Sequence, residues 1–185
     1  MEPLRRDPVL AELIDEHGVL EIEPADDPFE RLVVSIINQQ LSGASAAAIR
    51  DRVFEQVEVT PVGMLAADDA VLRDAGLSAQ KIEYIRNVAR AFEEDGLSRE
   101  QFDGEDDDAV IDELTDIRGV GVWTAKMFLI FCLGREDVFP VEDLGIRKGM
   151  SVLYDLDHRD AMVEKAEDWR PYRSYASRYV WRAVD

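Results

Sequence analysis

The sequence has little of several things that would define a class of protein at once. It contains one cysteine, Cys132, in 185 residues, which excludes an internal disulfide and any zinc or iron–sulfur site built from four cysteines. No apolar run reaches the ~18 residues that a membrane-spanning helix needs. Lysine is scarce too, because only four of the 21 basic residues are lysine. We therefore expect a cytoplasmic protein that spans no membrane.

Positive charge is also in short supply, and it is unevenly distributed. Forty acidic residues give a net charge of -19, which by itself argues against a nucleic-acid partner. Four stretches nevertheless carry ten of the bases and none of the acids: residues 33–50, 117–135, 144–154 and 169–184. Buried helices avoid carboxylates, which explains part of this pattern. It does not explain why the same stretches keep ten basic residues. Our hypothesis for the acidic remainder is a salt-rich (halophilic) cytoplasm, where screening acts within about 3 Å at 1 M salt.

Strand-like alternation is nearly absent, whereas helical periodicity is common. Only residues 19–23, VLEIE, alternate as a strand would, which is too little for a sheet. A helix is predicted to start at Pro28, with Asp27 as its N-cap and Glu30 completing a capping box. Apolar spacing predicts further helices from about residue 42 and over 78–96, 107–117, 122–134, 143–154, 159–168 and 171–183. The sequence therefore predicts an all-α fold.

A Gly-Val-Gly tripeptide separates two of these predicted helices. Gly119 and Gly121 allow backbone conformations that are closed to residues with a Cβ atom. A turn of this kind before a helix leaves several N–H groups pointing outward, and such a nest binds an anion with help from the helix dipole. A DNA phosphate is the natural candidate, because the contact needs no basic side chain. An ordinary tight turn between two helices is the alternative.

Four motifs in order resemble one family. The run LTDIRGVGVWTA, residues 114–125, closely resembles the helix-hairpin-helix signature of the HhH-GPD DNA glycosylase superfamily. The segment DVFPVEDLGIRKG at 137–149 resembles the one that holds the family's catalytic Asp, and WRPYRSYASRYVWR at 169–182 resembles the last helix of the alkylbase branch, the 3-methyladenine DNA glycosylase type. The run SIINQQLSGASAAAI at 35–49 resembles the loop and helix that enter the lesion site.

The resemblance implies a two-lobed, all-α glycosylase domain over residues 1–185. One lobe would be residues 36–135 with the hairpin at 115–123, and the other would combine 1–35 with 136–185. It implies a monomeric, monofunctional enzyme of base excision repair that hydrolyses the N-glycosidic bond of cationic purines, such as 3-methyladenine, in double-stranded DNA. No organic cofactor is implied. A glycosylase for deaminated or oxidised purines and a non-catalytic DNA-binding module remain alternatives.

Within this family the catalytic carboxylate would be Asp143. It would stabilise the oxocarbenium-like sugar and orient or deprotonate water. Asp143 is also a good N-cap for the helix that follows it, and Glu142 is the neighbouring alternative. The flipped, positively charged base would stack in a pocket of electron-rich rings. The candidates for that pocket, each with a core position as the alternative, are Trp123, Trp181, Tyr175 and Tyr179.

A wedge would fill the hole that the flipped base leaves in the duplex. By the resemblance, the loop NQQLSG supplies it, and the candidates are Gln40 and Leu41. The alternative is that Gln39 and Gln40 cap the preceding helix while Leu41 packs in the core.

The hairpin backbone would hold the phosphate beside the lesion, through Gly119, Val120, Gly121 and Thr124. In the family, hairpin carbonyls also hold a monovalent cation, Na⁺ or K⁺, for which the candidate donors are Thr115, Ile117 and Val120. Other phosphates would meet basic side chains, although a solvated arginine is the commoner case on a helix; the candidates are Arg147, Lys148, Arg173 and Arg178.

Trp123 distinguishes two branches of the family. Members that also cut the strand carry a lysine two positions after Gly-x-Gly, where this chain has Trp123. Schiff-base chemistry needs an amine nucleophile, which an indole does not supply. Lys126 and Lys148 stand at other positions, so we expect no lyase activity.

Overall fold

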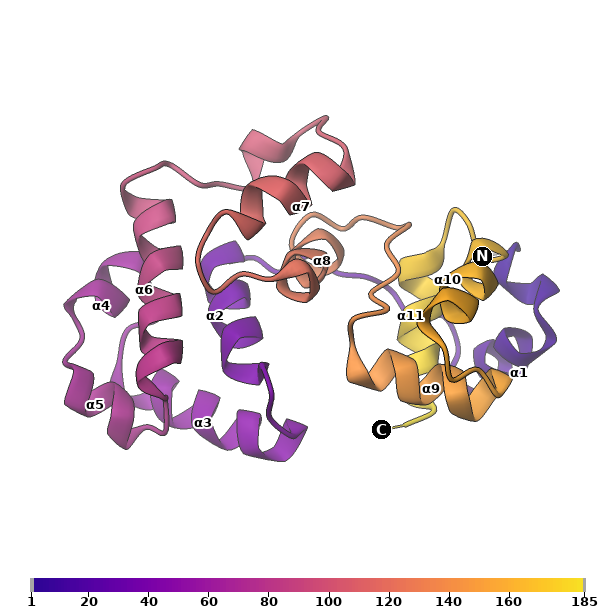
Figure 1. Cartoon of the computed structure of the whole chain (residues 1–185), viewed down its shortest axis with the longest axis horizontal. Helices are drawn as coiled ribbons and strands as arrows, with labels where there is room; N and C mark the ends of the chain where they lie inside the picture. Colours follow the sequence, from indigo (N-terminus) through magenta and orange to yellow (C-terminus); the bar gives the residue numbers. More distant parts are fainter. Residues whose placement is uncertain (1, 185) are drawn as a thin grey trace. The chain divides into compact units, whose positions relative to one another are not determined.

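The computed structural model describes residues 2–184 and is built from helices (Figure 1). Within those residues no segment forms a β-strand, and residues 19–23 are part of a connection without helix or strand. Each helix among the same residues is too short or too polar to cross a membrane. The elements are η1 (Leu4–Arg6), α1 (Pro8–His17), α2 (Pro28–Asn38), α3 (Gly43–Gln56), α4 (Pro61–Ala66), α5 (Asp69–Asp74), α6 (Ala79–Glu93), η2 (Glu100–Phe102), α7 (Asp107–Thr115), α8 (Val122–Phe131), α9 (Leu144–Tyr154), α10 (Arg159–Glu167) and α11 (Arg173–Arg182).

Contacts divide the chain into two compact units. The continuous unit runs from Ala25 to Phe128, and the split unit combines the residues up to Pro24 with those from Leu129 onward. The boundaries implied by the resemblance, after residues 35 and 135, differ from these. The difference at the first boundary arises because α2 packs against α3 and α6, which makes it part of the continuous unit.

The continuous unit is organised around α6. This helix packs against α2 and α4 and runs between them in Figure 1. Phe29 of α2 meets Phe92 of α6 edge to face, with ring centroids 5.5 Å apart. The predicted start of α2 is confirmed, because the Asp27 carboxylate accepts the N–H groups of Phe29 and Glu30 at 2.8 and 3.1 Å. Local capping thus fixes where α2 begins, and apolar burial fixes which face it turns to α6.

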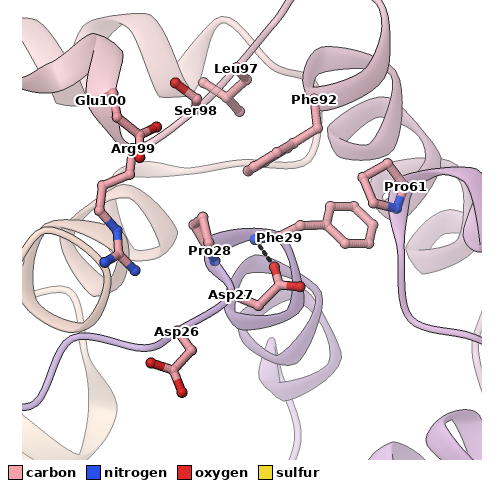
Figure 2. A pocket seen from close by; sticks show the side chains of 10 residues that line it. All are labelled: Asp26, Asp27, Pro28, Phe29, Pro61, Phe92, Leu97, Ser98, Arg99 and Glu100. Atoms are coloured by element: carbon pink, nitrogen blue, oxygen red, sulfur yellow. Dashed lines mark hydrogen bonds between the residues drawn. The ribbon is translucent and has the colours of Figure 1, made fainter.

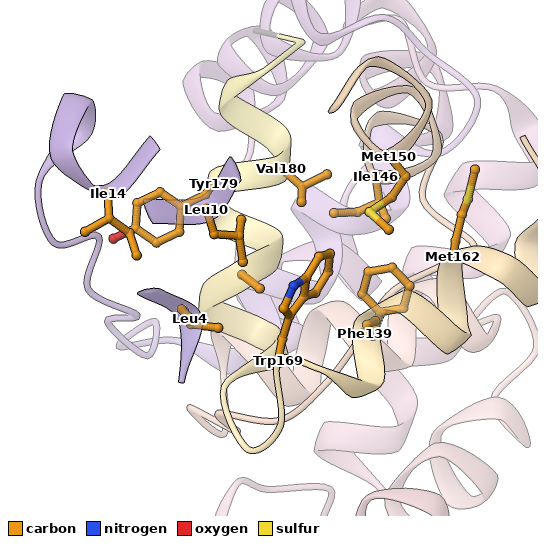
Figure 3. Packing of buried hydrophobic residues seen from close by; sticks show 12 residues of the cluster. Leu4, Leu10, Ile14, Phe139, Ile146, Met150, Met162, Trp169, Tyr179 and Val180 are labelled. Carbon is orange, nitrogen blue, oxygen red and sulfur yellow. The ribbon is translucent and has the colours of Figure 1, made fainter. Parts of the chain in front are cut away.

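The core of the split unit is made from both ends of the chain. Figure 3 shows Leu10 and Ile14 of α1 in the same cluster as residues of α9 and α11, with the fully buried Trp169 among them. Helices α9 and α11 approach closely at Gly149, where an added Cβ atom would lie 2.4 Å from the Val180 carbonyl oxygen. A larger residue at position 149 would therefore push α9 away from α11.

A buried carboxylate joins α1 to the carboxyl-terminal segment. Asp7 caps α1 through the N–H groups of Val9 and Leu10, and its second oxygen accepts from Trp169 Nε1 at 3.0 Å. Lys165 Nζ lies 3.0 Å from the same oxygen. Burial alone would raise the pKa of Asp7, but the hydrogen bonds from Trp169 and Lys165 outweigh it and hold that pKa below its ordinary value.

Candidate active site and DNA-binding hairpin

Asp143 lies at the amino end of α9 in the split unit, half-buried. Its Oδ1 accepts the N–H of Ile146 at 2.9 Å, as an N-cap does, and also the indole N–H of Trp181 at 2.9 Å. Gly145 leaves room for this contact, because an added Cβ atom would lie 2.9 Å from Trp181 Cδ1. The structure therefore brings together two residues that are 38 positions apart in the sequence, and two donors fix the orientation of the carboxylate.

The Trp181 ring is held on one face as well as at its edge. It stacks on Phe131, the last residue of α8, with ring centroids 6.0 Å apart and an interplanar angle of 29°. No local pattern indicates this partner, because Phe131 is one of several apolar residues in the run FLIFCLG. The indole is thus oriented from two directions while its side chain stays half-buried.

Arg147 holds the segment that precedes Asp143. Its Nη1 donates to the carbonyl oxygens of Val141 and Glu142, so at least one guanidinium nitrogen is committed to the loop. Lys148, the next residue, is exposed. Of these two predicted DNA contacts, Lys148 is the one whose side chain is open to a phosphate, and Arg147 contributes to the position of the carboxylate.

The structure corrects the prediction for Arg173. Its guanidinium binds the Asp137 carboxylate at 2.8 Å and the Glu167 carboxylate at 3.0 Å, and only 15% of its side chain is exposed. Two acids therefore neutralise this arginine, which joins the start of α11 to the segment after α8 instead of offering its charge to DNA. Arg178 is half-buried and donates to the Glu21 carbonyl at 3.2 Å, so its predicted phosphate contact stays a prediction.

The two tyrosines predicted for the base pocket differ in burial and in their contacts. Tyr179 is fully buried in the core of the split unit, where its hydroxyl donates to the Gly18 carbonyl at 2.8 Å and accepts the Leu20 N–H at 3.1 Å. Tyr179 is thus a core residue, which is the alternative that the sequence left open for these aromatic side chains. Tyr175 packs edge to face on Tyr172 and donates to Glu136 at 3.1 Å. It precedes Trp181 by six residues, a rise of about 9 Å along α11, on another face of the helix.

The hairpin between α7 and α8 gives its two glycines different roles. Gly119 has a φ of 109°, which residues with a Cβ rarely adopt, and an added Cβ atom would lie 2.3 Å from the Tyr84 ring. Gly121 has no positive φ, and nothing lies within 4 Å of the Cβ position. The expectation that both glycines relieve backbone strain is therefore right for Gly119 only. The fold requires Gly119, whereas Gly121 leaves open space beside the first turn of α8.

The remaining hairpin residues face inward to different degrees. Val120 is buried, and its N–H donates to the Ile117 carbonyl at 2.9 Å. Thr124 is buried too, and its hydroxyl oxygen accepts from Gln39 Nε2 at 3.1 Å. A phosphate contact at Thr124 would therefore use the backbone N–H, which the first turn of a helix leaves without a carbonyl partner in its own helix. Trp123, in the same turn, is half-buried.

The predicted wedge residues stand at the surface of the continuous unit. Gln40 and Leu41 are exposed in the turn between α2 and α3, so the alternative of a core position for Leu41 is excluded. Gln39 behaves differently, because its side chain donates to the Gly119 carbonyl at 3.0 Å and to Thr124. A further residue, Lys81 of α6, donates to the Ile37 and Gln39 carbonyls. No local pattern in the sequence indicates the contacts of Gln39 or those of Lys81.

The carbonyl oxygens predicted for a monovalent cation belong to the α7–α8 turn. Thr115 is the last residue of α7, and Ile117 and Val120 follow it in the turn. Neutral carbonyl oxygens suit a hard cation of low charge, and the Ile117 carbonyl, which accepts one hydrogen bond, keeps a second lone pair. Residues 2–184 contain no group of three or more His, Cys, Asp or Glu side chains placed to hold a metal ion.

A separate pocket lies beside the amino end of α2. Figure 2 shows the rings of Phe29 and Phe92 on one side of it and Arg99 on another, with the Asp27 cap of α2 at its edge. The Arg99 guanidinium donates to the Ala25 carbonyl, which ties it to the chain before α2. None of the predicted site residues lines this pocket, so it is not the predicted base pocket.

Comparison with known proteins identifies the class. The model of the HhH-GPD superfamily of base excision DNA repair proteins matches residues 33–171, and the chain belongs to this superfamily. It is 30% identical over 95% of its length to the putative DNA-3-methyladenine glycosylase YfjP of Bacillus subtilis. It is 33% identical over 84% of its length to DNA-3-methyladenine glycosylase 1 of Schizosaccharomyces pombe. The chain spans 66% and 72% of these relatives, or about two thirds of their length.

A solved structure agrees with this placement. The 3-methyladenine DNA glycosylase of Schizosaccharomyces pombe, determined in complex with abasic DNA, superposes with a TM-score of 0.88 and 29% sequence identity. The match covers 98% of this chain and 94% of that one. The predicted all-α fold and the predicted family, the 3-methyladenine DNA glycosylase type of the HhH-GPD superfamily, are confirmed.

Proposed function

We propose that the chain hydrolyses the N-glycosidic bond of alkylated, positively charged purines such as 3-methyladenine in double-stranded DNA. Support comes from the relatives, which are named for this activity, and from the similar structure solved with abasic DNA, the kind of product that such a reaction leaves. The protein would act as an intracellular monomer on duplexes with a damaged base.

The observation that carries the proposal is the held carboxylate of Asp143. Two N–H donors, from Ile146 and Trp181, orient it at the amino end of α9. A fixed negative charge stabilises an oxocarbenium-like sugar without reorganising during the reaction. The bond from the sugar carbon to the base nitrogen breaks, and its electron pair neutralises the departing cationic purine. Water adds to the sugar carbon and its proton passes to the carboxylate, which leaves an abasic site.

The damaged base would be recognised by aromatic rings. Positive charge on an alkylated purine favours the electron-rich face of an indole, by about 0.5–2 kcal/mol per contact. Trp123 and Trp181 are both half-buried, and they remain the candidates. Because a cationic purine is already a good leaving group, little general-acid assistance is needed. A glycosylase for deaminated purines would need such assistance. A preference for charged bases over neutral ones would therefore distinguish an alkylbase glycosylase from a glycosylase for deaminated purines.

The hairpin would hold the DNA beside the lesion. The open space at Gly121 lets a phosphate approach the N–H groups at the start of α8, where the helix dipole favours an anion. Bound at Thr115, Ile117 and Val120, a Na⁺ or K⁺ ion would add positive charge near that phosphate. Lys148 is a further contact by charge. Together these interactions would allow a chain of net charge -19 to bind a polyanion.

Release of free base from DNA that carries 7-methylguanine and 3-methyladenine tests the activity. Asp143→Asn keeps an oxygen that can accept from Ile146 and Trp181, so the variant should fold while its rate falls by about a hundredfold or more. Glu142→Gln is the matched control and should keep near-normal activity. A non-catalytic DNA-binding module would bind the duplex and release no base. Borohydride should trap no protein–DNA adduct, because Trp123 supplies no amine.

A further inference from the structure

The loop that carries Gln40 and Leu41 is held in an unfavourable conformation. It joins α2, which ends at Asn38, to α3, whose N-cap is Ser42. Gln40 has a φ of 59°, in the left-handed region, which is unfavourable for a residue with a Cβ atom. Leu41 leaves 40% of its surface in water. Such a conformation persists only when the surroundings over-determine it.

Lys81 provides one of the attachments that hold the loop. Its ammonium group reaches from α6 to the carboxyl end of α2, where it donates to the Ile37 carbonyl at 2.6 Å and the Gln39 carbonyl at 2.8 Å. Both acceptors are neutral oxygens, and partial burial lowers the pKa of Lys81. A positively charged donor at the last carbonyls also interacts favourably with the negative end of the α2 dipole. The lysine thus fixes the position of the residue directly before Gln40.

Gln39 provides the second attachment, on the side of the hairpin. Its Nε2 donates to the carbonyl of Gly119 at 3.0 Å and to the hydroxyl oxygen of Thr124 at 3.1 Å. Gly119 is the hairpin glycine with the positive φ, and Thr124 lies in the first turn of α8. One residue therefore joins the loop to the element proposed to hold the DNA backbone, within the continuous unit.

We infer that Lys81 and Gln39 are positioning residues that hold the Gln40–Leu41 loop at a set distance from the phosphate-binding hairpin, so that the loop enters the duplex where the hairpin grips it. The inference rests on the proposed function, because the loop acts as a wedge only if a base is flipped. Flipping a paired base is opposed by pairing and stacking, whereas an unpaired base leaves the helix more easily. Loss of the attachments should thus impair excision of paired lesions more than excision of unpaired ones.

The test compares one lesion in two settings. A 7-methylguanine is placed opposite cytosine in one duplex and in a single-nucleotide bulge in another, and kcat/KM is measured on both. Lys81→Met keeps the length of the side chain and removes the donor. We expect its kcat/KM to fall between about tenfold and a hundredfold on the paired lesion, the range for a displaced group near a reacting centre, and much less on the bulge. Lys81→Arg should recover most of the activity, because it restores a cation that donates to the two carbonyls.

Matched variants keep the outcome decisive. Arg90→Met removes a positive charge from the same helix at an exposed position and should change neither rate. Gln39→Met tests the second attachment if Lys81→Met does not fold, and should show the same selective loss. Equal losses on both duplexes, or no loss on either, would overturn the inference. If the wild-type protein releases no base from either duplex, the proposed function fails instead, so the two failures are distinguishable.

Discussion

The two hairpin glycines offer a test that separates what the fold requires from what DNA requires. We consider Gly119→Ala and Gly121→Ala as a pair, because both add a single methyl group to the same turn. At position 119 the methyl carbon would lie 2.3–2.6 Å from three atoms of Tyr84, and the φ of 109° is unfavourable for alanine. Overpacking costs about 1–3 kcal/mol, and the strained backbone adds about as much. Gly119→Ala should therefore lose about 3 kcal/mol of stability.

At position 121 the fold has room for a methyl group. The methyl group would enter open space at an ordinary φ, so the free energy of unfolding should change by less than about 1 kcal/mol, with a small gain from the restricted unfolded chain. The same methyl group would stand where the phosphate approaches the backbone. A lengthened hydrogen bond to a charged group loses about 1.5–3 kcal/mol, which corresponds to roughly tenfold or more in Kd.

Thermal unfolding and DNA binding together measure the difference. Circular dichroism should show Tm lowered by about 6–12 °C for Gly119→Ala and nearly unchanged for Gly121→Ala. Fluorescence anisotropy with a duplex that carries an abasic-site analogue, at fixed KCl, should show the reverse order for Kd among folded proteins. Unchanged affinity of Gly121→Ala would refute the reasoning, as would a loss of stability equal to that of Gly119→Ala.

Three further perturbations follow from the contacts of the split unit and from the charge distribution. Trp181→Phe keeps a ring but removes the donor to Asp143, so the single-turnover rate constant for base release should fall about tenfold with little change in Tm. An unchanged rate constant would show that the indole N–H does not orient the carboxylate. Asp7→Asn should cost about 3 kcal/mol at pH 7, because it leaves Lys165 without its buried partner. Since the folded pKa of Asp7 is lowered, its contribution is complete above the ordinary value of 3.8 and is lost as the pH falls through the folded pKa, so the variant should show a flatter acid limb in urea titrations. Finally, if the acidic surface is adapted to salt, Tm should fall when KCl is reduced from 2 M to 0.1 M, where the screening length grows to about 10 Å; undiminished stability at low salt would remove that hypothesis.

Local rules account for the parts of the fold that the sequence predicted well. Asp27 before Pro28 and Asp143 before Leu144 are both N-caps in the structure, since a short carboxylate satisfies the N–H groups of the turn that follows it. Cys132 is buried, as its apolar neighbours indicated. The start of α11 was predicted two residues early, because Pro171 lies in the turn before the helix and not in its first turn.

The misses share a different cause. Arg173 pairs with Asp137, and Lys81 binds the end of α2, each across 36 or more positions in the sequence. A local sequence pattern does not indicate a partner at that separation. For Tyr179 the sequence pattern favours the core position that was left open as the alternative. With Ala176 and Val180 it forms the i, i+3, i+4 stripe of a buried helix face, which favours a core position over a pocket wall.

The topology of the split unit has a consequence for synthesis on the ribosome. Helix α1 depends on partners that are translated after the continuous unit, because Asp7 binds Trp169 and the Gly18 carbonyl accepts the Tyr179 hydroxyl. The continuous unit lies between them and is finished first. At about 5–20 residues per second, the amino-terminal helix waits roughly 8–30 seconds for its partners. A nascent chain interrupted before Trp169 would leave the apolar face of α1 exposed. Chaperones and proteases could then recognise the incomplete chain by this exposed surface.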